Sequence, residues 1–480
     1  MPNIEPKMRL IIYLMQVILS CYAAPKEYTT YPRILEERKA AGNLVLQLND
    51  KITLNLEKST VLADNLIFVT STKDLHEVET VDTSDIQENI YHDTHYQSSL
   101  MVQRKDGNVE VEGIINDNLR IRPLPEGERS VQGQMLHKIF EVDPINANYI
   151  KAEPEILRLR ERNNNEISNG SRKSPESPQS RTANVEKFSV ELHIISDKAH
   201  QKYYKKNQEL ISYLAILANA ANLRYLDMDN PKISFLLVGV TRAKDHDFAR
   251  NNNGEIEAGE MLSGLHSYKK EGKIPGKHDI VYLMTGLDMI KFNNGRKENA
   301  IAGRAYIGAA CAGHGIGEGE DTAPTYNGVN TMAHELAHSL GSPHDETPEC
   351  PWSEGYLMSY IDGGLRKYRL SRCSEKSIRE YVRKQSDECI RVLNEHNYME
   401  NQKKFPGQTV REQYFCKQLL KKEAKGQKIV VKKSGGCDIG CCYRNFNYMT
   451  CFKYHRLDGM SCGRGMSCKR GVCGKHQWLN

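Results

Sequence analysis

Near the start of the chain, apolar and polar residues alternate in the run NLVLQLNDKITLNLEKS, residues 43–59. Six apolar residues occupy alternate positions on either side of a polar pair: Leu44, Leu46, Leu48, Ile52, Leu54 and Leu56. A period of two predicts β-strands, and the pair Asn49-Asp50 between them predicts a hairpin turn. We therefore expect a β-rich N-terminal domain without cysteines, because none lies between residues 25 and 310.

From residue 187 onward the pattern changes to strands that alternate with helices. Short apolar runs predict four strands, at Lys187–Ser196, Lys232–Val240, Asp279–Gly286 and Gly303–Ala310. Apolar residues at helical spacing predict an amphipathic helix over Asn207–Leu226, and a closing helix is expected over Ser374–Gln385. This alternation predicts a mixed or parallel sheet covered by helices.

The segment between these two regions, residues 158–184, has almost no apolar residues and is rich in Ser, Asn, Pro and charged side chains. Such a composition predicts a flexible linker that proteases can cut. Arg158, Arg160, Arg162 and Arg181 offer cleavage sites, and Asn169 lies in the only N-glycosylation sequon, NGS.

The first residues predict a secreted protein. Lys7 and Arg9 precede the apolar run Leu10–Ser20, and small residues follow up to Ala24. This order is typical of a signal peptide cut near Ala23 or Ala24. No later apolar stretch approaches the ~18 residues that a spanning helix requires, so we expect a soluble extracellular protein.

The cysteines agree with an oxidising compartment. Of the 13 cysteines, Cys21 lies in the predicted signal peptide, which leaves four in a middle block and eight in the last 65 residues. Even counts predict disulfides closed within each block. The alternative for the last block is a zinc site of cysteine pairs, which we disfavour because no C-x-x-C pair occurs there.

Charge is distributed unevenly. Residues 403–480 contain 17 Lys and Arg against 4 Asp and Glu, a net of +13, whereas the whole chain carries +5. A basic module on an acidic body predicts anionic partners, such as glycosaminoglycans or acidic plasma proteins; the alternative is a solvated surface that only aids solubility. We expect neither a nucleic-acid nor a membrane partner.

The candidate chemistry lies in HELAHSLGSPH, residues 334–344. On a helix, His334 and His338 project from one face, one turn apart, and their nitrogens can reach one metal ion. Gly341 predicts the end of that helix, after which the chain can deliver His344 as a third ligand. Glu335 is rotated about 100° from His334 and can reach a water on the metal. The alternative, a helix with solvated histidines, does not account for the spacing of all three.

Three imidazoles with an open fourth position are typical of a catalytic zinc ion. In that arrangement the ion lowers the pKa of water, Glu335 takes its proton, and the hydroxide attacks a polarised carbonyl group.

The motif, followed by GYLMSY at residues 355–360, resembles the metzincin proteases, in which Met358 would form an apolar floor beneath the metal. Asp345 directly after His344 resembles the reprolysin (adamalysin) branch. The run YPRILEERKAAGNLVLQLNDKITLNLEKSTVLADN and the run DGMSCGRGMSCKRGVCG resemble the propeptide and the cysteine-rich module of secreted tick salivary reprolysins.

This resemblance implies an α/β (α+β) catalytic domain with a mixed twisted sheet and an active-site helix. A β-rich propeptide would precede it, and a small disulfide-rich module would follow. We divide the chain into a signal peptide (1–24), a propeptide (25–160), a linker with maturation sites (161–186), a reprolysin domain (187–395), a second linker (396–415) and a basic cysteine-rich module (416–480).

The resemblance also implies disulfides Cys311–Cys389 and Cys350–Cys373, and an edge strand at GRAYIG on which an extended substrate adds as another strand. Family members cleave extracellular proteins, and the salivary ones are associated with fibrinogen, fibrin and matrix proteins.

Three features depart from the family pattern. Residues 25–190 contain no cysteine that could silence the zinc, so latency would come from a propeptide that covers the cleft or chaperones the fold. Tyr360 could act at the oxyanion or the zinc, but we favour a side chain packed in the specificity pocket. Glu191 and Asp279 fit a calcium site, whereas Val392 replaces its third ligand, so calcium stays open.

Two functions therefore compete. The leading hypothesis is a secreted zinc metalloendopeptidase. The alternative is a secreted binding protein that acts through the basic module, with a weak or silent protease domain. The presence of the general base Glu335 favours catalysis.

Overall fold

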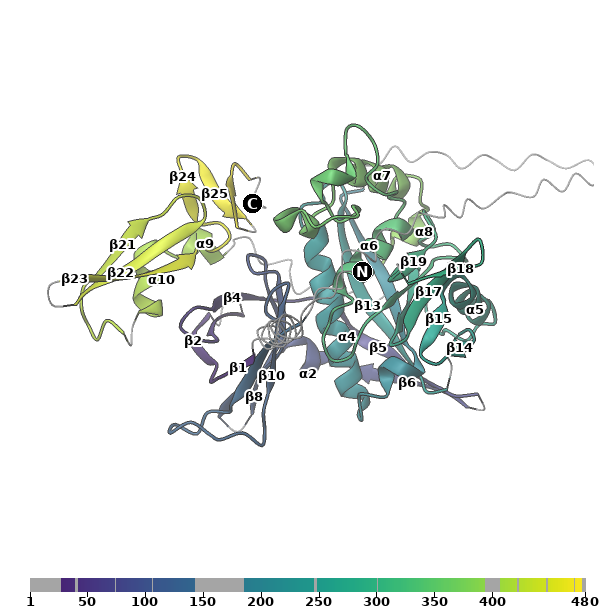
Figure 1. Ribbon diagram of the computed structural model, residues 1–480, viewed down its shortest axis with the longest axis horizontal. Coiled ribbons are helices and arrows are strands. Elements are labelled where there is room, and N and C mark those ends of the chain that lie inside the picture. Colours follow the sequence, from purple (N-terminus) through teal and green to yellow (C-terminus); the bar gives the residue numbers. More distant parts are fainter. Residues whose placement is uncertain are drawn as a thin grey trace, which may run out of the picture.

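The computed structural model describes residues 27–38, 42–73, 75–105, 107–142, 185–245, 248–299, 301–392, 406–420, 423–445, 448–469 and 471–476. Figure 1 shows three regions: an N-terminal sheet, a large α/β unit and a small C-terminal module. The expected signal peptide, the sequon at Asn169, most of the first expected linker and half of the second lie outside the described residues. None of the helices in the described ranges is long and apolar enough to cross a membrane.

The α/β unit is built on a seven-stranded sheet in the order β19-β20-β16-β12-β13-β5-β6. Its strands are β5 (Leu62–Ser71), β6 (His76–Asp82), β12 (Lys187–Ser196), β13 (Lys232–Ala243), β16 (Ile280–Thr285), β19 (Gly303–Ala305) and β20 (Ile316–Glu320). Strands β12, β13, β16, β20 and β5 run parallel to their neighbours, whereas β19 and β6 are antiparallel edges. The sheet is therefore mixed, as the alternation of strands and helices predicted.

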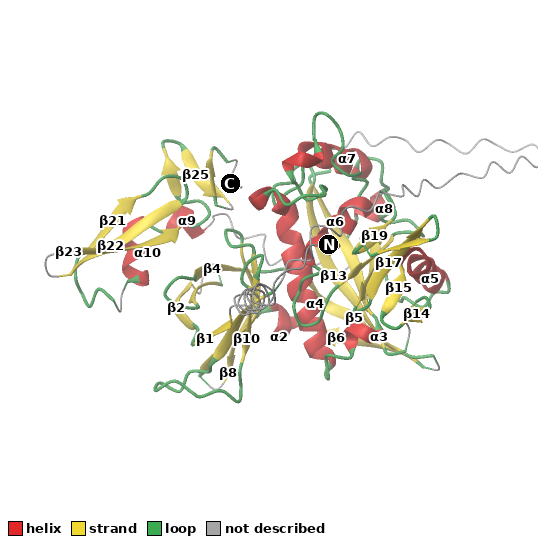
Figure 2. Ribbon diagram, viewed as in Figure 1, coloured by secondary structure: helices red, strands yellow, loops and turns green. Residues whose placement is uncertain are grey.

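Helices cover both faces of this sheet (Figure 2). On one face lie α4 (Asn207–Asn222) and α6 (Val329–Ser339), and α5 (Ala258–Lys270) lies on the other. Alternate residues of β16 belong to separate apolar clusters, with Tyr282 on the α4 and α6 side and Leu283 on the α5 side. Further short elements are α3 (Lys198–Gln201), α7 (Arg372–Val382), α8 (Asp387–Ile390) and a four-stranded sheet of β14 (Asn251–Asn252), β15 (Glu255–Glu257), β17 (Asp288–Asn293) and β18 (Arg296–Glu298).

The remaining N-terminal strands form a nine-stranded sheet in the order β1-β11-β10-β9-β8-β7-β4-β3-β2. They are β1 (Glu27–Thr30), β2 (Arg33–Arg38), β3 (Asn43–Gln47), β4 (Thr53–Lys58), β7 (Ile90–Asp93), β8 (Ser98–Lys105), β9 (Asn108–Ile114), β10 (Leu119–Pro123) and β11 (His137–Glu141). Strands β3 and β4 pair antiparallel, which confirms the predicted hairpin. All six of its alternating apolar residues lie in one buried cluster.

The C-terminal module combines α9 (Pro406–Thr409) and α10 (Glu412–Leu419) with two three-stranded sheets. These are β21 (Ile429–Lys433), β22 (Asp438–Asn445) and β23 (Tyr448–His455), and β24 (Ser461–Gly463), β25 (Met466–Lys469) and β26 (Val472–Gly474). Its eight cysteines form four disulfides: Cys416–Cys441, Cys437–Cys468, Cys442–Cys451 and Cys462–Cys473. Closure within the block confirms the disulfide prediction and leaves no thiolate pair there for the alternative zinc site.

The sequence pattern located most of the catalytic elements. Strand β12 has the predicted bounds, and the predicted helix over residues 207–226 is α4 followed by a 3-10 turn, Leu223–Tyr225. The strand expected over Gly303–Ala310 ends at Ala305. Strand β20, IGEGE, was not predicted, because glycines and glutamates at alternate positions do not resemble a buried strand.

Candidate active site

Helix α6 carries the first two histidines of the motif. Its apolar residues face the core: Met332, Ala333, Leu336 and Ala337 are each fully buried. The helix ends at Ser339 and Leu340 caps it; Gly341 follows with φ +94°, a conformation that glycine adopts without strain. A Cβ at Gly341 would lie 2.9 Å from Cβ of Tyr381, so glycine is also the residue that fits there.

The turn after Gly341 brings His344 back to the helix. Its Nε2 lies 3.0 Å from Nε2 of His334 and 3.1 Å from Nε2 of His338. Ligands that surround one zinc ion at ~2.0–2.1 Å in a tetrahedron lie roughly 3.3 Å apart. The three ring nitrogens therefore converge on a point that suits one metal ion, and they form a candidate metal-binding group.

The opposite ring nitrogens fix how each histidine is protonated. Nδ1 of His334 lies 2.9 Å from the carbonyl oxygen of Leu357, and Nδ1 of His338 lies 2.7 Å from that of Ser342. A carbonyl oxygen can only accept, so both Nδ1 atoms carry the hydrogen and both Nε2 atoms present a lone pair. Nε2 lone pairs that converge with no hydrogen between them are the arrangement in which neutral imidazoles bind a cation, so the residues present fit a zinc ion.

Burial keeps these rings neutral. It lowers the pKa of His334 to about 4 and that of His338 to about 3, where the neighbouring His334 adds to the effect. The pKa of His344 is lowered further still, first by burial and then by the other two histidines. Neutral imidazoles are the form that binds metals.

Glu335 lies beside the histidines and is 6% exposed. Burial raises its pKa to about 8, and the positive charge of Arg304 acts in the opposite direction. Gly303 of the edge strand β19 lies against this side chain, because a Cβ built there would come within 2.9 Å of Oε1 of Glu335. The carboxyl group thus lies between the metal-binding helix and the sheet edge, with a pKa suited to taking and returning protons near neutrality.

Met358 is fully buried in the same apolar core as the inner face of α6. The backbone of the loop that carries it contacts one of the histidines and the residue that follows another. Leu357 accepts the hydrogen bond from His334, and the carbonyl oxygen of Met358 accepts one from the N–H of Asp345, at 2.9 Å. The expected Met-turn therefore lies next to the histidines.

Tyr360, which we expected in the wall of the specificity pocket, contacts one of the three histidines. Its hydroxyl group lies 2.8 Å from Nδ1 of His344 and donates to Oε1 of Glu346, at 2.7 Å. Because that hydroxyl hydrogen points to Glu346, the oxygen accepts from Nδ1–H of His344. The Nε2 lone pair of His344 is thereby directed toward the other two histidines. Sequence reasoning considered Tyr360 as a direct ligand or an oxyanion group and did not consider this contact.

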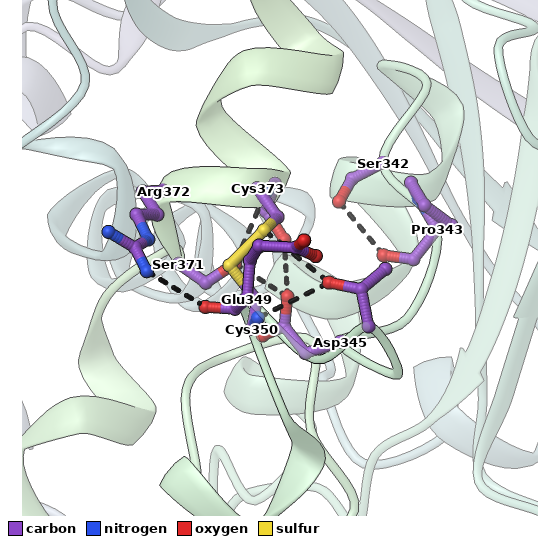
Figure 3. The surroundings of a disulfide bond; sticks show 10 residues. Ser342, Pro343, Asp345, Glu349, Cys350, Ser371, Arg372 and Cys373 are labelled. Carbon is purple, nitrogen blue, oxygen red and sulfur yellow. Dashed lines mark hydrogen bonds between the residues drawn. A yellow bond between two sulfur atoms is a disulfide. The ribbon is translucent and has the colours of Figure 1, made fainter.

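Hydrogen bonds and a disulfide join the loop after His344 to helix α7 and to Ser371 before it (Figure 3). Oδ1 of Asp345 accepts hydrogen bonds from Ser371, at 2.5 Å, and from Ser374, at 3.2 Å. The disulfide Cys350–Cys373 closes the same loop onto the same helix. A second disulfide, Cys311–Cys389, joins the segment after β19 to α8. Both pairs are those that the family resemblance implied.

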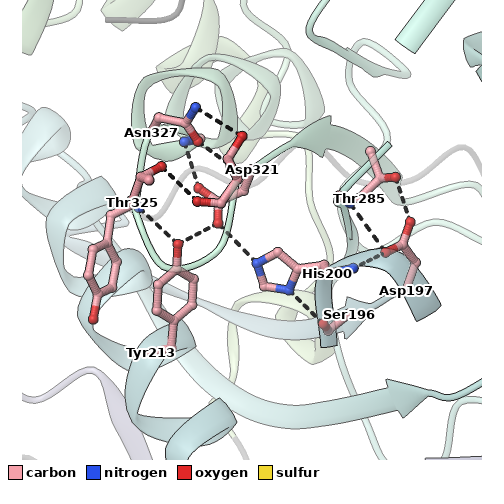
Figure 4. A network of polar contacts seen from close by, with 12 residues as sticks. Ser196, Asp197, His200, Tyr213, Thr285, Asp321, Thr325 and Asn327 are labelled. Atoms are coloured by element: carbon pink, nitrogen blue, oxygen red, sulfur yellow. Dashed lines mark hydrogen bonds and ion pairs between the residues drawn. The ribbon is translucent and has the colours of Figure 1, made fainter. Parts of the chain in front are cut away.

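A buried polar network holds the start of α6 (Figure 4). Nε2 of His200 lies 3.0 Å from Oδ2 of Asp321, and the hydroxyl of Tyr213 donates to the same oxygen. Oδ1 of Asp321 accepts from the N–H of Gly328, the residue before α6. Ser196 lies 2.6 Å from the other ring nitrogen of His200, but the side chains of His200 and Asp321 are fully buried, so this Ser-His-Asp arrangement is structural. No sequence motif revealed it.

Two of the three positions considered for calcium, Glu191 and Asp279, lie next to each other. The N–H of Glu191 donates to Oδ2 of Asp279, at 2.8 Å, and both residues are buried. Val392 packs instead against the apolar cluster of Ala63, Leu236 and Val238. These contacts leave calcium binding as a prediction.

Comparison with known proteins agrees with this geometry. Residues 187–394 match the model of the reprolysin (M12B) family of zinc metalloproteases. This part of the chain is a reprolysin-type metalloprotease domain. The protein is thus a metalloendopeptidase of the zinc-dependent class. Among the described residues, the three converging histidines are a group that could hold its metal and that contains no disulfide-bonded cysteine.

Similar proteins include arthropod metalloproteases. The venom metalloproteinase antarease TserMP_A of Tityus serrulatus is 26% identical, over 65% of this chain and 82% of its own length. The venom metalloproteinase BumaMPs1 of Olivierus martensii is 24% identical, over 75% of this chain and 91% of its own. A Bombyx mori protein named "a disintegrin and metalloproteinase with thrombospondin motifs like" is 22% identical, over 80% of this chain and 64% of its own.

Proposed function

We propose that this reprolysin is a secreted endopeptidase that cleaves extracellular proteins, with fibrinogen, fibrin and matrix proteins as its substrate class. The observation that carries the catalytic part is the convergence of three Nε2 lone pairs beside a buried glutamate. The substrate class rests on the resemblance to secreted reprolysins and on the venom relatives.

In the proposed mechanism, His334, His338 and His344 hold a zinc ion, which when bound lowers the pKa of water and polarises the substrate carbonyl. Glu335 accepts the proton of the attacking water at its carboxylate and returns it to the amine that leaves. The Tyr360 hydroxyl holds the ring of His344 in place, and the backbone of Leu357 does the same for His334. Met358 keeps the floor of the site dry and rigid.

The substrate would bind along β19. This strand is an edge of the sheet, and its first residue lies against Glu335. An extended peptide that pairs with the free side of β19 would pass its scissile bond between that carboxyl group and the histidines.

We propose the following organisation for the rest of the chain: a cleaved signal peptide, a propeptide, a linker that is cut during maturation and a C-terminal binding module. Lys432, Lys433 and Arg444 are exposed on the strands of that module. With the net charge of +13 for residues 403–480, they support binding to sulfated polysaccharides or acidic plasma proteins. If the protease were silent, this module would be the functional part.

The test is digestion of fibrinogen, gelatin and casein, with and without a zinc chelator. We expect cleavage that the chelator abolishes and zinc restores. Glu335→Ala should fold, bind zinc and cut nothing. Heparin-affinity chromatography of the same variant tests the binding function separately, with Lys432→Glu/Lys433→Glu as the comparison.

A further inference from the structure

We propose that the N-terminal segment, residues 27–142, stays bound to the protease domain as a non-covalent subunit after the connecting segment is cut. The mature enzyme would then consist of two chains. This inference concerns assembly and does not depend on the proposed substrates or on peptidase activity.

The first argument is the central sheet. Strand β5 of the N-terminal segment pairs in parallel with β13, from Leu62 opposite Leu237 to Ser71 opposite Ala243. Backbone hydrogen bonds extend this pairing at both ends, from Leu237 N–H to the carbonyl of Val61 (2.7 Å) and from Lys244 N–H to that of Ser71 (2.9 Å). Loss of the segment would leave one whole side of β13 as an unpaired edge.

The second argument is the core. Leu66 and Phe68 of β5 are fully buried, and both belong to the apolar cluster that contains Phe188 and Phe235 of the protease domain. The same cluster includes Ile90, Met101 and Ile114 of the nine-stranded sheet. A single core shared between the two segments means that their separation exposes apolar surface on both of them.

The third argument is a buried polar junction on α4. The Oγ atom of Ser59 donates to Oδ1 of Asn219 at 2.7 Å, and Nδ2 of Asn219 donates to Oγ of Ser99 at 2.9 Å. Ser99 in turn donates to the carbonyl of Ile216, at 2.7 Å. All three polar side chains are buried and have partners across the junction, so the two surfaces satisfy each other's hydrogen-bonding groups.

Further polar contacts join the two segments away from this junction. Nε of Arg120 donates to the carbonyl of Thr325 at 2.6 Å, and Lys367 forms an ion pair with Asp117. The hydroxyl of Tyr268 donates to Oγ of Ser71, at 2.8 Å. The contacts come from three separate parts of the protease domain, so the interface extends beyond α4.

The bound segment lies away from the substrate edge. In the sheet order, four strands separate β5 from β19 (Figure 1). Within the described ranges, no hydrogen bond or ion pair joins residues 27–142 to His334, Glu335, His338 or His344. A retained segment therefore leaves the edge at β19 available to a substrate.

The test uses the full-length chain with Glu335→Ala, so that self-digestion plays no part. A recognition sequence for a site-specific protease is inserted within residues 161–184, the chain is cut, and the product is run on a size-exclusion column under native conditions. We expect both fragments in one peak at equal stoichiometry, with separation only in denaturant. Elution of residues 27–142 in a separate peak, whether or not the remainder stays folded, overturns the proposal.

Two glycines provide a matched comparison at the interface. Gly113 has φ +133° and lies against α4, where a Cβ would meet the carbonyl oxygen of Ser99 at 2.5 Å and Cγ2 of Ile216 at 3.2 Å. Gly107 has φ +78° but no atom within 4 Å of its Cβ position. Alanine at either position is destabilised because a residue with a side chain disfavours a positive φ. Only Gly113→Ala also places a methyl group against the atoms of the junction.

After cutting, we expect Gly113→Ala to release the N-terminal fragment at least tenfold faster than Gly107→Ala does. Equal release from the two variants would show that the junction on α4 does not hold the segment. If Gly113→Ala does not fold, Ser99→Ala, which removes only the shared hydroxyl group, takes its place with the same expected direction.

Discussion

The hydroxyl group of Tyr360 lies 2.8 Å from Nδ1 of His344 and donates its own hydrogen to Glu346. Backbone carbonyls hold the other two histidines of the motif. The third ligand is therefore oriented by a side-chain relay, and a single substitution can test it.

Tyr360→Phe should weaken zinc binding by about 10–100-fold, because groups that orient a metal ligand contribute on that order. The expected readout is faster loss of zinc to a chromogenic chelator, with kcat reduced at subsaturating zinc and partly restored at high zinc. Tyr203→Phe, which removes the hydroxyl of a half-exposed tyrosine, is the control. Equal rates of zinc loss in the two variants would show that the Tyr360 hydroxyl does not support the metal ligand and would favour a pocket-wall residue.

Gly303→Ala should displace the general base. The added methyl group would come within 2.6 Å of Cγ2 of Thr331 and 2.9 Å of Oε1 of Glu335, so one of them must move. Because small displacements of catalytic groups can cost ~100-fold in rate, we expect kcat to fall by at least tenfold while zinc content stays unchanged. Gly313→Ala, at a position with open space, should retain full activity.

Glu335→Gln should abolish turnover and spare the fold. Proton transfer by a positioned side chain contributes about 10²–10⁴-fold, whereas the amide occupies nearly the same volume in the buried site. Thermal unfolding and metal analysis should match those of the parent protein. Cleavage at the parental rate would show that another group serves as the base.

Stability should depend on pH through Glu57. Burial, followed by the charges of Asp458 and Asp93, raises the pKa of Glu57 to about 8 from an ordinary 4.5. Burial likewise raises the pKa of Asp93 to about 7. Between its pKa in the unfolded chain and its higher pKa in the folded protein, such a carboxyl group is protonated in the folded protein and ionised in the unfolded chain. The free energy of unfolding therefore falls as the pH rises through this range.

Burial lowers the pKa of His92 to about 4, which opposes this trend only up to about pH 6.5. Between pH 6.5 and 8 we therefore expect the free energy of unfolding to fall by about 1–2 kcal/mol. Urea unfolding of zinc-loaded protein at the two pH values checks this, and Glu57→Gln should reduce the slope. A slope that is the same in the variant would assign the pH dependence to other groups.

The sequence predicted local features well and relationships between distant segments poorly. The hairpin of Leu44 to Leu56 and the strand Lys187–Ser196 follow from hydrophobic periodicity, which the neighbouring residues determine. The pairing of β5 with β13 joins residues more than 160 positions apart, and nothing in the pattern of residues 62–71 specifies that partner.

The same distinction holds in the site. His334 and His338 are spaced by one helical turn, and a glycine turn after the helix leads to His344. Both features are local, so they could be predicted from the sequence. The relay from His344 through Tyr360 to Glu346 depends on how the loop of Met358 packs against the residues after α6. The role of Gly303 depends on where the sheet edge meets Glu335. These are tertiary contacts, and a single sequence does not encode them in a recognisable motif.

The most direct test of the central claim is the zinc content of purified protein, measured by atomic emission for the parent chain and for His344→Ala. The three-histidine account predicts about one zinc ion per parent chain and a loss of most of it in the variant, together with all chelator-sensitive cleavage. A parent chain that cleaves protein without zinc, or a variant that keeps a full equivalent, would contradict it.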